Sequence, residues 1–135
     1  MIDLHTHSLL SDGELTPAEL ARRFEVAGYR ALAITDHGDP SNIDLIIPRL
    51  VAFCNEANRL EGIRLVPGVE LTHIRPEAIP ALVSRSRKLG ARLVVVHGET
   101  GLLVPLEGAS PQQFAQALAA AVNRLLAEAE SLARA

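Results

Sequence analysis

The chain has 135 residues, a formal net charge of −3 at pH 7 and a hydrophobic content of 48%. This length supports a single domain, residues 1–135, with a hydrophobic core of its own. No basic run is present, and three Phe, one Tyr and no Trp offer few rings to stack on bases. The composition therefore argues against a nucleic-acid partner.

The apolar runs are far shorter than a membrane span, and the first residues lack the charged and apolar regions of a signal peptide. The single cysteine, Cys54, excludes an intramolecular disulfide and favours a reducing compartment. We therefore expect a cytoplasmic protein without a membrane partner. Cys54 falls in a helical apolar stripe, which predicts an inert core thiol rather than a nucleophile.

Four short apolar segments have the character of β-strands. They cover residues 2–7, 31–35, 63–66 and 93–96, and the pattern leaves open a continuation of the third at 71–74. Three helices are expected between them, at residues 17–28, 48–62 and 76–89, the last beginning at Pro76 or Pro80. The first follows a capping box at 16–19. The second is taken to begin at Pro48, because a proline deeper inside a helix would kink it.

Strands and helices alternate with short connections, which predicts a parallel sheet with right-handed crossovers. In such sheets functional groups gather at the carboxyl ends of the strands. All four predicted strands end in potential metal ligands, which are His5 and His7, His37, Glu70, and His97. Four separate strand ends would each need a coincidental ligand, so this repetition is the strongest functional signal in the sequence.

Histidine and carboxylate ligands without thiolates suit Zn, Mn or Fe(II). Five or more at one edge indicate two metal ions rather than one, and such a pair can activate a water and stabilise a phosphoryl group. The candidate metal ligands are His5, His7, Asp12, His37, Glu70 and His97. The candidate catalytic residues are Glu70, as a carboxylate that bridges two metals, and Asp36, as a group that orients a histidine through its free ring nitrogen.

Other polar residues have simpler interpretations. Asp12 precedes Gly13, and this pair is also a generic turn signal. His73 is expected to be a hydrogen-bonded structural residue. The remaining acidic residues near the strand ends, Asp3, Asp39 and Glu99, are expected to be strand-end, loop or ligand-orienting charges.

Four segments together form a longer pattern. They are residues 3–8 with 11–13 (Asp-Leu-His-Thr-His-Ser and Ser-Asp-Gly), 34–38 (Ile-Thr-Asp-His-Gly), 67–73 (Pro-Gly-Val-Glu-Leu-Thr-His) and 94–100 (Val-Val-Val-His-Gly-Glu-Thr). This pattern resembles the polymerase and histidinol phosphatase (PHP) family of metal-dependent phosphoesterases. Over residues 1–100 the resemblance implies part of a distorted seven-stranded (β/α) barrel with a two- or three-metal site. It implies as ligands His5, His7, His37, Glu70 and His97, and less directly Asp12, where the family varies.

Beyond residue 100 the chain departs from that family, which continues with three more strands that bring another His and a final Asp-x-His. Residues 97–105 and the Leu/Ala-rich segment after them instead resemble the end of a GT-B glycosyltransferase of the family 4 type. A chimera joined at this local similarity and a truncated PHP chain with an unrelated tail would both explain the pattern. The tail predicts a strand at 101–104 and, after a capping box at 110–113, an amphipathic helix.

We therefore predict an α/β fold with about five parallel strands, in which a partial PHP barrel (1–100) is closed by the tail strand and helix (101–135). The arrangement is either a flavodoxin-like three-layer sandwich, which needs helices on both faces of the sheet, or a half barrel that pairs with a second copy. The expected activity is hydrolysis of a small phosphomonoester or a nucleotide with one to three Zn, Mn or Fe ions, in a monomer or homodimer. Because the second half of the ligand set is missing, the alternative is a non-catalytic chimeric scaffold that at most binds metal.

Overall fold

The structure, a computed structural model, describes residues 1–60 and 62–98. All of these residues belong to one compact unit. The strand and helix expected in the tail lie outside the described residues, as does Glu99. The single domain 1–135 therefore stays a prediction.

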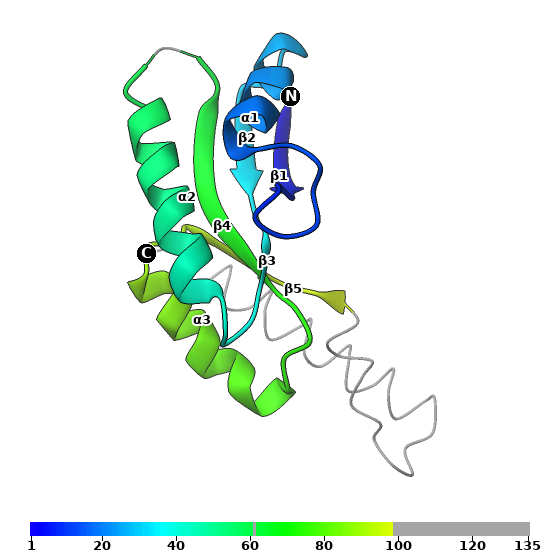
Figure 1. Cartoon of the computed structure of the whole chain (residues 1–135), viewed down its shortest axis with the longest axis vertical. Helices are drawn as coiled ribbons and strands as arrows, with labels where there is room; N and C mark the ends of the chain where they lie inside the picture. The colour runs from blue at the N-terminus through cyan, green and yellow to red at the C-terminus, as the bar shows by residue number, and fades with distance from the viewer. Residues whose placement is uncertain (61, 99–135) are drawn as a thin grey trace, which may run out of the picture. The chain divides into compact units, whose positions relative to one another are not determined.

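Five strands and three α-helices make up the described chain (Figure 1). In order they are β1 (Ile2–Thr6), α1 (Pro17–Val26), β2 (Ala31–Ile34), β3 (His37–Gly38), α2 (Ile43–Ala57), β4 (Arg64–Leu71), a 3-10 turn η1 (Pro76–Ala78), α3 (Ile79–Lys88) and β5 (Leu93–Val96). All the strand pairs are parallel: β1 with β2, β2 with β4, β3 with β4, and β4 with β5. The predicted α/β fold with a parallel sheet is confirmed.

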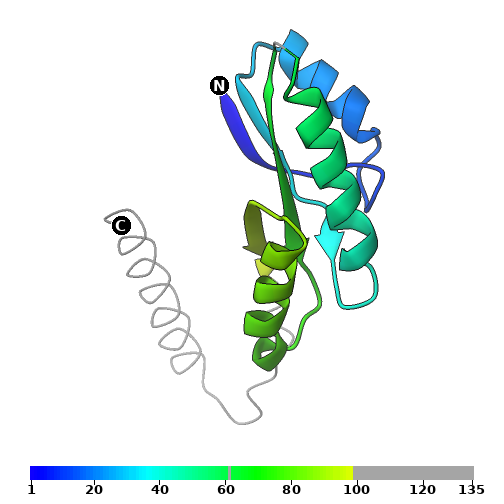
Figure 2. The same ribbon diagram turned by 90° about the vertical axis from the view of Figure 1, so that its left-hand side faces the viewer.

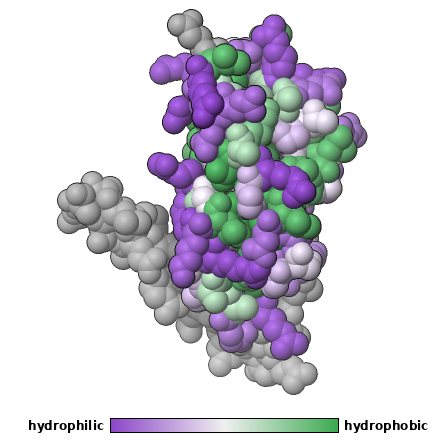
Figure 3. Space-filling model, turned by 60° about the vertical axis from the view of Figure 1, so that its left-hand side comes forward, coloured by the Kyte–Doolittle hydropathy of each residue, from purple (hydrophilic) through white to green (hydrophobic). Residues whose placement is uncertain are grey.

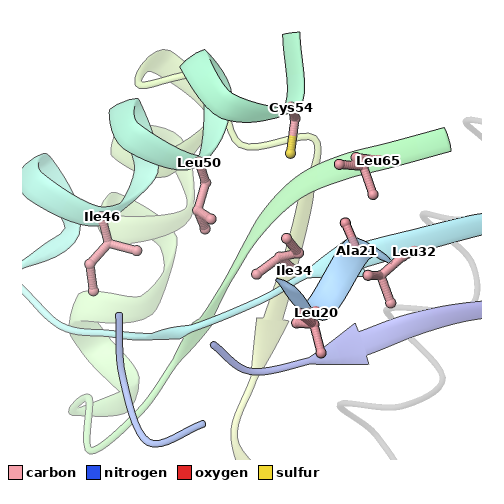
Figure 4. Close-up of a cluster of buried hydrophobic side chains, with 8 residues drawn as sticks. All are labelled: Leu20, Ala21, Leu32, Ile34, Ile46, Leu50, Cys54 and Leu65. Carbon is pink, nitrogen blue, oxygen red and sulfur yellow. The ribbon is translucent and has the colours of Figure 1, made fainter. Parts of the chain in front are cut away.

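The three helices pack on one face of the sheet. In one hydrophobic cluster, Leu20 of α1 and Leu50 of α2 pack with Leu65 of β4 (Figure 4). In a second cluster, α2 and Leu82 of α3 pack with Leu71 of β4. Side chains alternate along a strand, so Leu65 and Leu71 point to the same face, and all three helices cover that face.

The sheet is therefore curled, with the helices on its outer face, as in part of a (β/α) barrel (Figure 2). A flavodoxin-like sandwich needs helices on both faces, and within residues 1–60 and 62–98 none lies on the inner face. Seen from the side of α2 and α3, the surface intersperses hydrophobic side chains with hydrophilic ones (Figure 3). Across the same residues, no helix is long and apolar enough to cross a membrane.

The second helix begins at Ile43 rather than at the predicted Pro48, which lies inside it. Pro48 cannot donate to the carbonyl of Asp44 one turn earlier, which weakens the helix. Its position is tolerated because Ile43 and Ile47 are both completely buried. Each buried isoleucine contributes about 1.5–3 kcal/mol, so burial outweighs the local preference for a helix start at proline.

The third strand is longer than predicted, since β4 runs unbroken from Arg64 to Leu71 through Pro67. Pairing with β2 ends at Pro67 and pairing with β5 begins at Gly68. The missing N–H of Pro67 therefore lies where the strand changes partners, which limits the damage to the ladder. The two-residue strand β3 was not predicted; it extends the sheet beyond β2 and pairs His37 with Glu70.

The loop after β1 folds back tightly. The carbonyl of Ser8 accepts hydrogen bonds from Ser11 N at 3.1 Å and from Gly13 N at 2.9 Å. Gly13 consequently lies so near the preceding strand that an added Cβ would be 2.3 Å from the carbonyl oxygen of His7. This close approach requires glycine at position 13.

Gly13→Ala is expected to lower the free energy of unfolding by about 1–3 kcal/mol, because the loop backbone must move to admit the methyl group. Urea denaturation measures the loss. Gly98→Ala is the matched control, since a Cβ there would meet no atom of residues 1–60 and 62–98 within 4 Å. Equal stability of the two variants would contradict the tight approach of the loop.

Candidate metal centre

The six candidate ligands come together at the carboxyl ends of the strands. They lie on β1 (His5), in the loop after it (His7, Asp12), on β3 (His37), on β4 (Glu70) and directly after β5 (His97). Strand pairing explains the convergence, because His37 pairs with Glu70 and the backbone N of His97 donates to Leu71 O at 2.9 Å. Their placement agrees with the sequence analysis; their role as ligands is taken up under Proposed function.

Glu70 lies at the centre of this cluster and is only 3% exposed. Its Oε2 atom lies 3.1 Å from His5 Nε2, 3.3 Å from His7 Nε2 and 3.3 Å from His37 Nδ1. Despite these short distances, Oε2 has no hydrogen-bond partner among the described residues. The Nε2 atoms of His5 and His7 and the buried Glu70 Oε2 therefore fit atoms that are aimed at a shared cation rather than at one another.

The spacing of these atoms suits a first coordination shell. Around a tetrahedral ion with bonds of about 2.0–2.1 Å, neighbouring ligand atoms lie about 3.3–3.4 Å apart. Three groups of potential ligand atoms satisfy a metal-like spacing, namely His5, His7 and Glu70; His7, Asp12 and His37; and His37, Glu70 and His97. The groups share members, so they form one continuous cluster rather than three separate sites.

Asp12 lies on the solvent-exposed side of the cluster. Its Oδ1 lies 3.2 Å from His7 Nδ1 and its Oδ2 lies 3.3 Å from His37 Nε2. Desolvation raises the pKa of the Asp12 carboxyl, but His37, His7 and hydrogen bonds within the loop outweigh this effect and the pKa falls below its usual value. Asp12 is thus an ionised carboxylate between two imidazoles, which a turn signal alone would not predict.

Thr72 sets the orientation of His37. Its Oγ1 lies 2.5 Å from His37 Nδ1, and its hydroxyl donates to the carbonyl of Glu70 at 3.2 Å. Since that hydroxyl hydrogen is already used, Thr72 accepts from Nδ1–H, which leaves the lone pair of His37 Nε2 directed at the Asp12 side. Sequence reasoning missed Thr72, although its place two residues after Glu70 puts it on the same face of the chain.

The hydrogen bonds that the structure gives Asp36 lead to a loop rather than to a histidine ring, and its role in orienting a histidine stays a prediction. Its carboxylate is fully buried and accepts hydrogen bonds from Ser8 N, Ser8 Oγ and Ser11 Oγ, each at 2.7 Å. Its partners therefore belong to the loop that carries Asp12. Sequence reasoning also missed Ser8 and Ser11, which lie within the recognised motif but were given no role. A direct catalytic role of Asp36 stays a prediction.

His73 differs from its expected structural role. Its side chain is exposed, its φ of 56° lies in the left-handed region, and within the part of the chain that the structure describes it makes no hydrogen bond. It lines a cavity of about 310 Å³ together with the candidate ligands Asp12, His37 and His97. A side chain at the edge of the cluster with unused hydrogen-bonding capacity is well placed to contact a ligand.

Asp39 and Cys54 were expected to be a loop or ligand-orienting charge and a core thiol, respectively. Asp39 also lines this cavity; hydrogen bonds from Ser41 lower the pKa of its carboxyl, with Asn42 and His73 adding to the effect against desolvation. Cys54 is completely buried in the first hydrophobic cluster, and desolvation raises the pKa of its thiol to about 12. The expectation of an inert core thiol at Cys54 is confirmed.

Comparison with known proteins agrees with this geometry. An uncharacterized protein of Methanocaldococcus jannaschii is 48% identical over 106 residues, which cover 78% of this chain and 48% of that protein. A 5'-3' exoribonuclease of Haemophilus influenzae is 39% identical over 70 residues, which cover 52% of this chain and 23% of the enzyme. The chain thus spans about half the length of the first relative and a quarter of the second. No solved structure matches.

The sequence model of the PHP domain matches residues 3–129. This match continues through most of the tail, and the comparisons give no support to the glycosyltransferase resemblance expected there. Family membership accounts for the ordered motifs at the strand ends and for the His and carboxylate cluster that they form. The chain belongs to the PHP-domain family.

Proposed function

We propose that this chain carries a phosphoesterase centre that holds Zn, Mn or Fe(II) and hydrolyses a small phosphomonoester or a nucleotide. The observation that supports the proposal is the convergence of imidazole nitrogens on the buried Glu70 Oε2, which makes no hydrogen bond among the described residues. Divalent metal ions bound at this cluster would activate a water and stabilise the oxygens of the phosphoryl group.

The chain's own residues have distinct parts in this proposal. His5 and His7 would hold one ion together with Glu70, and Glu70 would also serve the group that contains His97. Asp12 and His37 provide a further binding position on the solvent side, with His37 oriented by Thr72. The three groups share His7, His37 and Glu70, so six residues would hold the ions and coordination positions would stay open for water and substrate.

The cavity of about 310 Å³ provides the space for the rest of the substrate. His73 and Asp39 lie on its wall and are not among the candidate ligands, so they would contact the group that carries the phosphate. A small phosphorylated molecule fits this cavity best. The bacterial relative is named an exoribonuclease, and a 5'-phosphorylated RNA end is therefore the second substrate to test, although the composition disfavours nucleic-acid binding.

The double variant His5→Ala, His7→Ala is expected to lose at least one equivalent of bound metal and to reduce hydrolysis of an aryl phosphate to background. Two ligand atoms of one group disappear, and a single remaining carboxylate binds these ions weakly. Plasma mass spectrometry measures the metal and absorbance measures the product. His73→Ala is the control, since it removes an imidazole from the cavity but not from the cluster. Metal binding without hydrolysis in the wild type would favour the non-catalytic alternative.

The control variant carries a prediction of its own. His73→Ala is expected to raise KM for a nucleotide about 2- to 13-fold, as for the loss of one hydrogen bond of about 0.5–1.5 kcal/mol, with kcat and metal content unchanged. Steady-state kinetics and metal analysis separate the two effects. An unchanged KM would remove His73 from the substrate-binding wall.

A further inference from the structure

The buried carboxylate of Asp36 lies next to the candidate metal cluster but is not part of it. It is 0% exposed, and its three hydrogen-bond donors are all neutral groups of Ser8 and Ser11. A buried charge is costly unless it is well hydrogen-bonded, and bonds to an ionised acceptor are about twice as strong as neutral ones. The attachment of the loop to Asp36 is therefore among the strongest polar interactions near the site.

The loop depends on these bonds for its shape. Ser8 donates to Asp36 through both its backbone N and its hydroxyl. The Ser8 hydroxyl in turn accepts from Leu10 N, and the Ser8 carbonyl accepts from Ser11 N and Gly13 N. The second point of attachment is the Ser11 hydroxyl, which donates to Asp36 Oδ1 at 2.7 Å. Asp12 lies between Ser11 and Gly13, so its carboxylate is held near His7 and His37 by a loop with two fixed points.

The backbone of Asp36 connects the same residue to the rest of the cluster. Its carbonyl accepts from Glu70 N at 3.0 Å, and the next residue is His37. One residue thus joins the loop that carries Asp12, the strand that carries His37 and the strand that carries Glu70.

We propose that Asp36 is a positioning residue that fixes the Ser8–Gly13 loop and thereby places Asp12 for metal binding before any metal is bound. The inference rests on the metal binding, though not on the hydrolysis, of the proposed function. It assigns to Ser8 and Ser11 the role of connecting Asp36 to a ligand that Asp36 itself does not touch.

The test is Ser11→Ala, which removes the bond of 2.7 Å from Ser11 Oγ to Asp36 Oδ1 and the longer bond of 3.3 Å from the same hydroxyl to Asp12 Oδ1, and retains every candidate ligand. Titration of the full chain with Zn²⁺ and with Mn²⁺ against a competing chelator is expected to show about a ten- to hundredfold weaker affinity, as for other groups that orient ligands. Ser11→Thr retains the hydroxyl and is expected to restore the affinity. Asp36→Asn is expected to weaken binding at least as much, and Ser11→Ala still decides the matter if Asp36→Asn fails to fold.

Ser86→Ala is the matched control, because Ser86 is a buried serine of α3 whose hydroxyl has no hydrogen-bond partner among the described residues. Amide hydrogen exchange on the metal-free proteins adds a readout that does not need metal. Exchange at Ser8, Ser11 and Gly13 is expected to accelerate in Ser11→Ala and to stay unchanged in Ser86→Ala.

The outcomes separate the two proposals. A wild-type protein that binds neither metal overturns the proposed function, while faster loop exchange in Ser11→Ala would still support positioning by Asp36. Unchanged exchange at the three loop amides overturns the positioning role whether or not metal binds. Wild-type metal affinity in Ser11→Ala also overturns it, as does an equal loss of affinity in Ser86→Ala.

Discussion

β4 pairs in parallel with β2, β3 and β5, and the candidate site exists because these strands end at the same edge of the sheet. Two backbone bonds show the effect: Glu70 N donates to Asp36 O at 3.0 Å, and His97 N donates to Leu71 O at 2.9 Å. They place residues far apart in the sequence around one carboxylate. The ladder also fixes the direction of that carboxylate, because a slip of one residue would turn Glu70 to the face that the helices cover.

The parallel sheet could be predicted because each long strand is an apolar run followed by a polar turn, and helix signals lie between the runs. The predicted element boundaries were wrong where a local sequence preference competed with the burial of apolar side chains. The rule against proline inside a helix predicted that α2 starts at Pro48. The burial of Ile43 and Ile47 instead moves the start of the helix back to Ile43. The two-residue strand β3 has no apolar run, since its pairing depends on the position of β4.

The placement of the candidate site could be predicted from the sequence about as far as the fold could. The positions of the histidines and of Glu70 followed from strand ends, which are visible in the sequence. The partners of Asp36 did not follow, because they depend on how the Ser8–Gly13 loop folds back, and hydrogen bonds between a loop and a strand leave no periodic pattern. The left-handed backbone of His73, with φ of 56°, could not be predicted either, because it too depends on loop conformation. Loop conformation is thus the limit of what this sequence reveals about its own site.

Asp36 and Glu70 look alike in the sequence, since both are acidic residues at the ends of buried strands, and the structure separates them by their hydrogen bonds. Asp36 accepts from three donors, so its charge is already stabilised and a cation would add little. Glu70 Oε2 and His7 Nδ1 are buried without hydrogen bonds within the described residues. Unsatisfied buried groups cost about 1–3 kcal/mol each, a cost that the packing of the core offsets. The unsatisfied carboxylate has the most to gain from a cation, and the satisfied one holds the loop that helps to place it.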